Sequence, residues 1–269
     1  MNCILCSTGA LLGRPNGRNF RLLSGLTGQL DCDGYEFMLY ESWYPELDAV
    51  LAEVGRLGLD IPVLHCDKGL GELLAAREYE EAERRFGLNC LAAERLGAKL
   101  LVLHLWNGKI SDSCIDNNFA ALEGLGRLAE RQGLTLTVEN VVCNHFDPQT
   151  HLDRLAASTD ARFTFDTKMA AFHGQLDDIF APEREKLWRD GRIAHIHVND
   201  YGGKPKEWKK LATLHLGDGN IDFENFFGNI KKRNYTGDFT VEATSFDASG
   251  KVDIDALNRD FRKIAAFIK

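Results

Sequence analysis

The 269-residue sequence lacks the features of several large protein classes. No apolar run approaches the roughly 20 residues that a membrane-spanning helix needs. The N-terminus has no basic region followed by a long apolar stretch, so we expect no signal peptide and a cytoplasmic protein. No Pro-rich, Ser-rich or low-complexity segment interrupts the chain. With 44% hydrophobic and 27% charged residues, the composition excludes a disordered or collagen-like chain and favours a globular protein.

A disulfide framework is also missing. The 7 cysteines are odd in number and dispersed along the chain, which indicates free thiols in a reducing compartment. Cys3 and Cys6 form a C-x-x-C pair, but it lies at the start of an expected strand and no second pair completes a zinc site. We therefore interpret these two cysteines as small buried apolar residues.

The chain also carries no net positive charge. The chain has 40 acidic and 32 basic residues, which gives a formal net charge of -8. Nucleic acids are polyanions, and anionic membranes attract basic proteins, so neither is favoured as a partner. We expect no nucleic acid and no membrane among the partners of this protein.

Short apolar runs alternate with longer amphipathic segments along the whole chain. The expected strands span residues 2–8, 34–39, 61–66, 99–105, 134–140, 162–166, 193–199 and 238–244. The expected helices span residues 46–57, 79–96, 115–132, 151–157, 175–189, 223–232 and 254–269. Such alternation predicts βα units and a parallel sheet. An open doubly wound sheet is the alternative, but residues 7–19 carry no clean G-x-G-x-x-G turn. The strand count and the length favour a single (β/α)8 TIM-barrel domain over residues 1–269.

Polar side chains gather at the carboxyl ends of the last four expected strands. In a barrel these ends face the active site, and alternation along each strand places one side chain from each on the inner face. The four are Glu139, Asp166, His197 and Glu242. Burying three carboxylates together is very unfavourable without a counter-charge. The set therefore predicts one divalent cation, with Mn²⁺ preferred and Mg²⁺, Co²⁺ or Zn²⁺ as alternatives.

Four motifs carry a resemblance to a known family. They are Thr-Val-Glu139-Asn, Phe-Asp166-Thr, His195-Ile-His197-Val-Asn-Asp200 and the His-Leu-Gly-Asp-Gly-Asn-Ile-Asp-Phe run at 215–223. In this order the sequence resembles the xylose-isomerase-like barrel superfamily, which holds sugar-phosphate isomerases, epimerases and endonuclease IV. The resemblance implies that Glu139, Asp166, His197 and Glu242 bind the metal. It also implies a homodimer or homotetramer.

The sequence departs from the DNA-repair branch of that superfamily. The positions that match the ligands of that branch's third zinc hold Met169, Leu211 and Thr213. His65 and His104 match its first zinc site and could hold a second metal with Glu139, although contacts to substrate hydroxyls are the favoured interpretation. The ketose 3-epimerases place a Glu where this chain has His145, and an Arg where it has Gly203 followed by Lys204.

The resemblance and the residues together predict a metal-dependent sugar or sugar-phosphate isomerase or epimerase. Its chemistry begins with removal of a proton next to a carbonyl and passes through a metal-stabilised enediolate. Glu139 and Glu242 are the expected acid and base. The expected substrate-binding residues are Glu36, His65, His104, Trp106, Lys168, Asp200 and Lys204.

Each of these residues also has a plainer interpretation. Glu36 could form a salt bridge inside the barrel, and Lys168 could be a solvated charge at its rim rather than a ligand for a phosphate or carboxylate. His195 is more readily read as a hydrogen-bonded core histidine than as a ligand. Three other functions stay open: a dehydratase of an inositol- or keto-acid-type substrate on the same metal, a disfavoured endonuclease IV-like repair enzyme, and a non-catalytic sugar-binding barrel.

Overall fold

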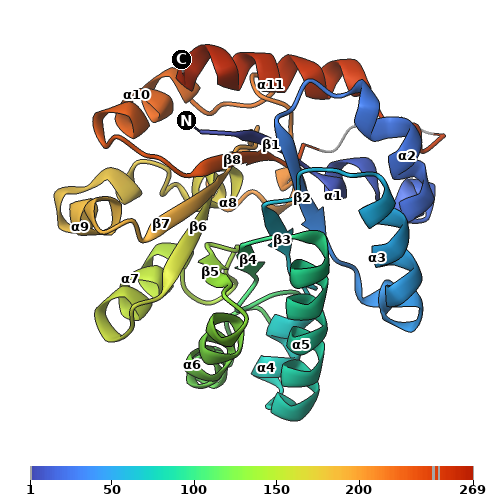
Figure 1. Ribbon diagram of the computed structural model, residues 1–269. Coiled ribbons are helices and arrows are strands. Elements are labelled where there is room, and N and C mark those ends of the chain that lie inside the picture. Colours follow the sequence, from blue (N-terminus) through green and yellow to red (C-terminus); the bar gives the residue numbers. More distant parts are fainter. Residues whose placement is uncertain (1, 244–245, 248, 269) are drawn as a thin grey trace. The chain divides into compact units, whose positions relative to one another are not determined.

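The computed structural model describes residues 2–243, 246–247 and 249–268, and Figure 1 shows its ribbon. The strands follow the order β1 to β8 in a closed parallel barrel, which confirms the predicted (β/α)8 fold class. The strands are β1 (Ile4–Ser7), β2 (Gly34–Met38), β3 (Val63–His65), β4 (Leu100–Leu103), β5 (Thr135–Glu139), β6 (Arg162–Asp166), β7 (Ile193–His197) and β8 (Asp238–Val241). Thr244, at the end of the expected last strand, lies outside the described residues.

Helices connect these strands. The α-helices are α1 (Thr8–Leu11), α2 (Leu23–Leu26), α3 (Leu47–Arg56), α4 (Leu70–Ala75), α5 (Tyr79–Leu96), α6 (Ile115–Arg131), α7 (Pro148–Ser158), α8 (Thr167–His173), α9 (Glu185–Arg189), α10 (Phe223–Lys232) and α11 (Ile254–Ile268). Short 3-10 turns occupy Arg14–Asn16, Phe20–Leu22, Thr27–Gln29, Glu41–Glu46, Asp178–Phe180, Pro182–Arg184 and Trp208–Lys210. None of the helices in the described ranges is both long and apolar enough to cross a membrane.

The chain divides into two compact units, one of residues 36–164 and the other of residues 1–35 with 165–269. We call them the central unit and the terminal unit and describe each by itself. The single-domain organisation expected from the sequence stays a prediction.

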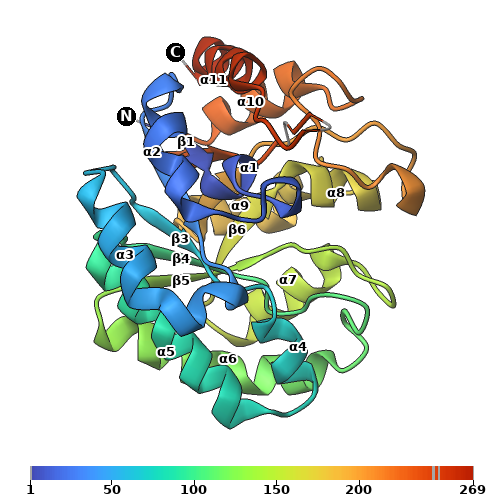
Figure 2. The ribbon, with the colours of Figure 1, turned by 90° about the vertical axis from the view of Figure 1, so that its right-hand side faces the viewer.

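The central unit is a parallel sheet covered by helices. Strands β2 to β5 pair in sequence order, and β5 pairs with the first residues of β6. Helix α5 packs beside α3, α4 and α6 on this sheet (Figures 1 and 2). It carries two glutamates in its first turn and is capped by Gly97, which has a φ of 82° that glycine adopts without strain. This helix has the bounds that the sequence predicts.

The terminal unit holds β8 between β1 and β7, all parallel. Helices α10 and α11 lie side by side and α11 packs on β1 and β8 (Figure 1). Phe239 of β8 faces these helices, since its ring lies 5.5 Å from that of Phe227 on α10. Thr240, the next residue, instead bonds His195 of β7. The alternation predicted for this strand is therefore present, and it carries Glu242 away from the helices.

One predicted helix is wrong. The segment expected to be helical over residues 175–189 forms two 3-10 turns, Asp178–Phe180 and Pro182–Arg184, before the short α9. Pro182 cannot donate a backbone hydrogen bond and its ring clashes with a preceding helical turn, so a continuous helix cannot pass through it. The sequence also did not predict the short helices α1, α2, α4 and α8, the last of which comes directly after β6.

Candidate metal centre and active site

Three of the predicted metal ligands gather in the terminal unit. Asp166 ends β6, His197 ends β7, and Glu242 follows β8, and each offers a ligand atom within 4.8 Å of those of the other two. The His197 Nδ1 atom lies 3.5 Å from Glu242 Oε2. Asp166 and His197 are fully buried, and the Glu242 side chain is 11% exposed. Two carboxylates and one imidazole therefore share a small, nearly dry volume.

Asn199 fixes the orientation of both carboxylates. Its Nδ2 donates to Asp166 Oδ2 at 3.0 Å and to Glu242 Oε2 at 3.3 Å. Its Oδ1 accepts the backbone N–H of Glu242 at 2.9 Å, and its own N–H donates to Thr167 Oγ1. Asn199 lies within one of the sequence motifs, but the motif alone indicates no role for it. Its position two residues after His197 along the chain was the available signal.

This donor set fits a divalent cation. Ligand atoms that surround an ion at about 2.1 Å lie about 3 to 4 Å from one another, in line with the spacing seen here. The amide of Asn199 supplies two donated hydrogen bonds but no charge, and a divalent cation would add the positive charge that favours burial of two carboxylates. Oxygen-rich donors with one imidazole suit Mn²⁺, Mg²⁺, Co²⁺ or Zn²⁺.

The fourth predicted ligand, Glu139, ends β5 in the central unit with two histidines beside it. His104 Nε2 lies 2.8 Å from Glu139 Oε2, and His65 Nε2 lies 3.3 Å from the same oxygen. All three side chains are buried, and their ligand atoms lie within 4.8 Å of one another. The structure thus brings together the catalytic and substrate-binding residues that the sequence predicts for β3, β4 and β5.

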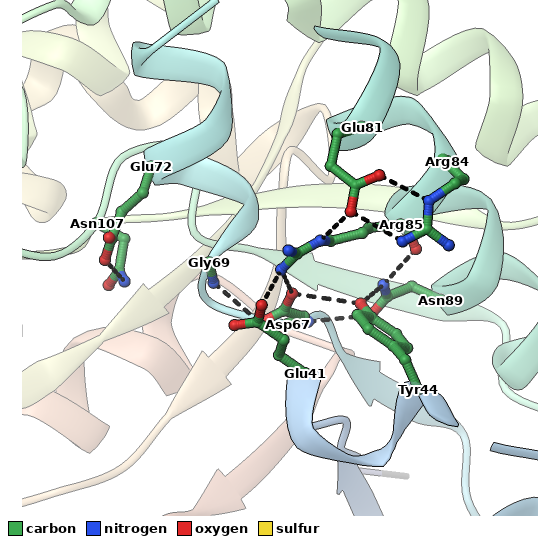
Figure 3. Close-up of polar contacts among 10 residues, drawn as sticks. All are labelled: Glu41, Tyr44, Asp67, Gly69, Glu72, Glu81, Arg84, Arg85, Asn89 and Asn107. Atoms are coloured by element: carbon green, nitrogen blue, oxygen red, sulfur yellow. Dashed lines mark hydrogen bonds and ion pairs between the residues drawn. The ribbon is translucent and has the colours of Figure 1, made fainter. Parts of the chain in front are cut away.

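Hydrogen bonds at Nδ1 fix the tautomers of both histidines. His65 Nδ1 lies 2.9 Å from the carbonyl oxygen of Cys66, so this nitrogen must carry the proton. His104 Nδ1 lies 3.1 Å from Asn107 Oδ1. The amide of Asn107 is oriented by Glu72, whose carboxylate accepts from Asn107 Nδ2 at 3.2 Å (Figure 3). With Nδ1 engaged in this way, the Nε2 atoms of both rings point toward Glu139 Oε2.

Burial keeps His104 neutral near pH 7. Desolvation lowers the pKa of His104 to about 4, although the charge of Glu139 opposes this shift. An imidazole lone pair and a carboxylate oxygen both accept hydrogen bonds, so a proton or a cation must lie between them at 2.8 Å. A metal ion bound to both atoms would supply that positive partner, which is one of the two roles that the sequence left open for His65 and His104.

A polar network holds the loop after β3, next to His65. Asp67 Oδ1 accepts the backbone N–H of Gly69 at 3.0 Å, and Asp67 Oδ2 accepts from the hydroxyl of Tyr44 at 3.3 Å. Arg85 of α5 pairs with Glu41 at 2.6 Å and with Asp67 at 3.5 Å (Figure 3). The network links the loops after β2 and β3 to α5, so it fixes the backbone that carries His65.

Trp106 forms part of a packed layer after β4. Its ring is fully buried, its Nε1–H donates to the carbonyl of Val141 at 2.9 Å, and it meets His151 edge-on at 5.1 Å. His151 Nε2 bonds Asp112 Oδ2 at 3.0 Å, and both residues are buried. The same carboxylate accepts from the backbone N–H groups of residues 144, 145 and 146. Trp106 is therefore held firmly against the loop that follows Glu139.

Replacing Asp112 with asparagine should lower the free energy of unfolding by about 2 kcal/mol, because buried backbone N–H groups lose acceptors. Burial alone would raise the pKa of Asp112, but hydrogen bonds from His151 and the backbone hold it well below its usual range. A carboxylate with a lowered folded-state pKa stabilises above its unfolded pKa of about 4 and loses this contribution as the pH falls further. Urea unfolding at pH 7 and pH 3 measures both effects, and the difference in stability between the two proteins should be smaller at pH 3 than at pH 7. A variant as stable as the wild type at pH 7 would contradict the assignment.

Two predicted substrate-binding residues lie in the segment after β7. Asp200 is fully buried, and its carboxylate accepts from the backbone N–H groups of residues 201, 217, 219 and 221. A carboxylate has about four lone-pair sites, so these bonds account for its acceptor capacity and make Asp200 a support for loop 215–222. Lys204 is exposed, and its backbone N–H donates to Glu207.

The remaining predicted residues are buried. Glu36 lies on β2, and it and His65 offer ligand atoms within 4.8 Å of one another. Lys168 lies on α8, two residues after Asp166, with only 7% of its surface exposed. His195 Nε2 bonds Thr240 Oγ1 at 2.8 Å, as its interpretation as a core histidine requires.

A closed parallel barrel with carboxylate and imidazole side chains at the carboxyl ends of its strands is typical of α/β-barrel proteins that bind a metal ion. A family model of the xylose isomerase-like TIM barrel matches residues 27–268. The chain belongs to this family, as the resemblance of its motifs implied.

Three individual proteins that resemble this chain share 25% or less of its sequence over the aligned residues. Inosose dehydratase of Clostridium perfringens is 25% identical over 200 residues, which are 63% of this chain and 66% of that protein. The chain thus spans slightly less than two-thirds of the length of the curated relatives that it matches. D-allulose 3-epimerase from Methylomonas sp., solved in complex with D-allulose, has a TM-score of 0.69 at 15% identity, with 98% of this chain and 96% of that chain covered. The IOLI protein with a bound zinc atom has a TM-score of 0.66 at 17% identity and coverage of 99% and 98%.

Proposed function

We propose that this protein is a divalent-metal-dependent sugar isomerase or epimerase. The observation that carries the proposal is the cluster of Asp166, His197 and Glu242, whose ligand atoms lie within 4.8 Å of one another at buried strand ends. The family's ligand pattern adds Glu139 as the fourth ligand, and Mn²⁺ is the preferred ion. Sugar epimerases among the solved structures of similar fold support a sugar as substrate.

The residues divide the chemistry between them. A bound divalent cation supplies positive charge for the oxygen beside the carbon that loses its proton. Glu139 and Glu242 take and return that proton, because a carboxylate held in a dry site is a stronger base than one in water. His65 and His104 accept hydrogen bonds from substrate hydroxyls through their Nε2 lone pairs, and Glu36 binds a further hydroxyl. Trp106 supports the wall of the pocket.

A dehydratase of an inosose-type substrate is the second candidate. Five of the six curated relatives carry the name inosose dehydratase, at 24 to 25% identity. Dehydration begins with the same removal of a proton next to a carbonyl and then expels water. The ligand set serves either reaction, and the products distinguish them.

A substrate screen in heavy water tests the proposal. EDTA-treated protein is reloaded with Mn²⁺ and incubated with ketoses such as D-allulose and D-tagatose, with ketose phosphates and with an inosose. Proton NMR should show deuterium entering next to the carbonyl in at least one compound, together with an epimer or aldose. A dehydrated product from the inosose would select the second candidate, and exchange in none of the compounds would refute both.

A further inference from the structure

Lys168 is a buried lysine whose ammonium group makes few polar contacts with the described residues. Only 7% of its surface is exposed, so it is not the solvated rim charge that the sequence allowed as an alternative. Its Nζ donates to Thr213 Oγ1 at 2.9 Å. Within the part of the chain that the structure describes, that is its one hydrogen bond, and no carboxylate oxygen lies within 4.0 Å of Nζ. An ammonium group has three N–H donors, so two are left for another partner.

A buried ammonium without a counter-ion is costly to fold. Moving such a charge out of water is unfavourable by several kcal/mol unless an opposite charge compensates it. Lysine is also readily exposed, since its flexible stem can carry the charge to the surface. Lys168 nevertheless stays buried on the helix that begins directly after the predicted metal ligand Asp166.

The segment that carries Thr213 is itself basic. Residues 202–214, which we call the strap, contain Lys204, Lys206, Lys209 and Lys210 but a single acidic residue, Glu207. None of these lysine side chains forms an ion pair with a described residue. In a chain of net charge -8, the strap is a local concentration of uncompensated positive charge.

The strap contacts α8, the helix that carries Lys168, through a hydrogen bond and an aromatic pair. The backbone N–H of Lys206 donates to the carbonyl of Phe172 on α8 at 2.6 Å. The ring of Trp208 meets that of Phe172 edge-on at 4.8 Å, although Trp208 is 51% exposed. Lys168 and Phe172 are four residues apart and so share one face of α8. The buried ammonium and the basic strap therefore form one connected feature.

We propose that Lys168 binds an anionic group on the substrate, a phosphate or a carboxylate, and that the strap lysines attract such substrates. This inference rests on the proposed function and narrows its substrate to acidic sugars. The ammonium and the Thr213 hydroxyl contact the anion, while the metal ligands act on the carbonyl end of the same molecule. Charged hydrogen bonds of this kind change affinity by about 10- to 100-fold.

Isothermal titration calorimetry tests the inference without turnover. D-ribulose, D-ribulose 5-phosphate and D-gluconate are titrated into metal-free and Mn²⁺-loaded protein. Wild-type protein should bind at least one of the anions about 10-fold or more tightly than D-ribulose. Lys168→Met should abolish that preference and leave D-ribulose binding within about 2-fold, and Lys168→Arg should keep part of it. The two anions distinguish phosphate from carboxylate recognition.

Lys186 on α9 provides the matched control, because it is an exposed lysine of the same unit. Lys186→Met should bind all three compounds as the wild type does. Thermal unfolding adds a readout of folding: Lys168→Met should be at least as stable as the wild type, since it removes a buried charge. Equal binding of neutral and anionic compounds by the wild type would overturn the inference, as would equal weakening of all three by Lys168→Met. Anion preference without proton exchange on any substrate would instead refute the proposed function alone.

Discussion

Replacement of Glu242 with glutamine is expected to lower kcat/KM by about 10³-fold, the scale of a lost general acid or base. Glutamine has the same shape and can still accept a hydrogen bond from Asn199 Nδ2, which lies 3.3 Å from Glu242 Oε2. It cannot take up a proton, and it removes one negative charge from the ligand cluster. The incorporation of deuterium next to the substrate carbonyl should fall in parallel with turnover, because both depend on the same proton transfer.

Glu224→Gln is the control for this experiment. Glu224 is exposed in the first turn of α10, in the same unit as Glu242, so its replacement makes the same chemical change away from the site. It should leave kcat/KM within about 2-fold of the wild type, as surface substitutions do. Binding of Mn²⁺ by Glu242→Gln, measured separately, divides the loss between metal affinity and proton transfer. A variant with unchanged metal binding and unchanged exchange would refute both roles of Glu242.

Much of the fold could be predicted because its signals are local. The strand Arg162–Asp166 and the helices Tyr79–Leu96 and Phe223–Lys232 begin and end where the sequence pattern places them. Periodicity identifies such segments when they are long or when they alternate cleanly. Helix α8 has only 7 residues, most of them buried, so it shows no amphipathic pattern. The predicted helix over 175–189 was wrong because the helix-like composition of the segment was given more weight than Pro182, which interrupts it.

The candidate site was predictable where charge marks it. Carboxylates and histidines at the ends of parallel strands point to Glu139, Asp166, His197 and Glu242 without knowledge of any contact. Asn199 carries no charge, so its two hydrogen bonds to carboxylates emerge only from the structure.

Other roles depend on segments that are distant in sequence. Asp200 supports the loop at 215–222 through backbone N–H groups that no motif reveals. The burial of Lys168 likewise depends on the strap, whose Thr213 accepts its hydrogen bond. Packing of this kind follows from tertiary structure and leaves no periodic signal in the sequence.

Removal of the metal should lower the melting temperature by about 5–10 °C. An ion present at 100 times its Kd stabilises the folded state by about 2.7 kcal/mol, and each kcal/mol shifts the melting temperature of a protein of about 150–250 residues by about 2–4 °C. The physical cause is the release of the repulsion between buried carboxylates when a cation joins them. Differential scanning calorimetry of EDTA-treated protein, with and without Mn²⁺, measures the shift.

Two variants locate the ion that causes this shift. Asp166→Asn removes a proposed metal ligand of the terminal unit, whereas His104→Gln changes a residue beside Glu139 in the central unit. We expect Asp166→Asn to lose most of the Mn²⁺-dependent gain and His104→Gln to retain most of it, with one Mn²⁺ per chain by elemental analysis. Comparable losses in both variants, with two ions per chain, would show that His65 and His104 bind a second metal rather than substrate hydroxyls. A melting temperature that ignores Mn²⁺ in the wild type would remove the basis of the metal site itself, because the buried carboxylates would then be compensated in another way.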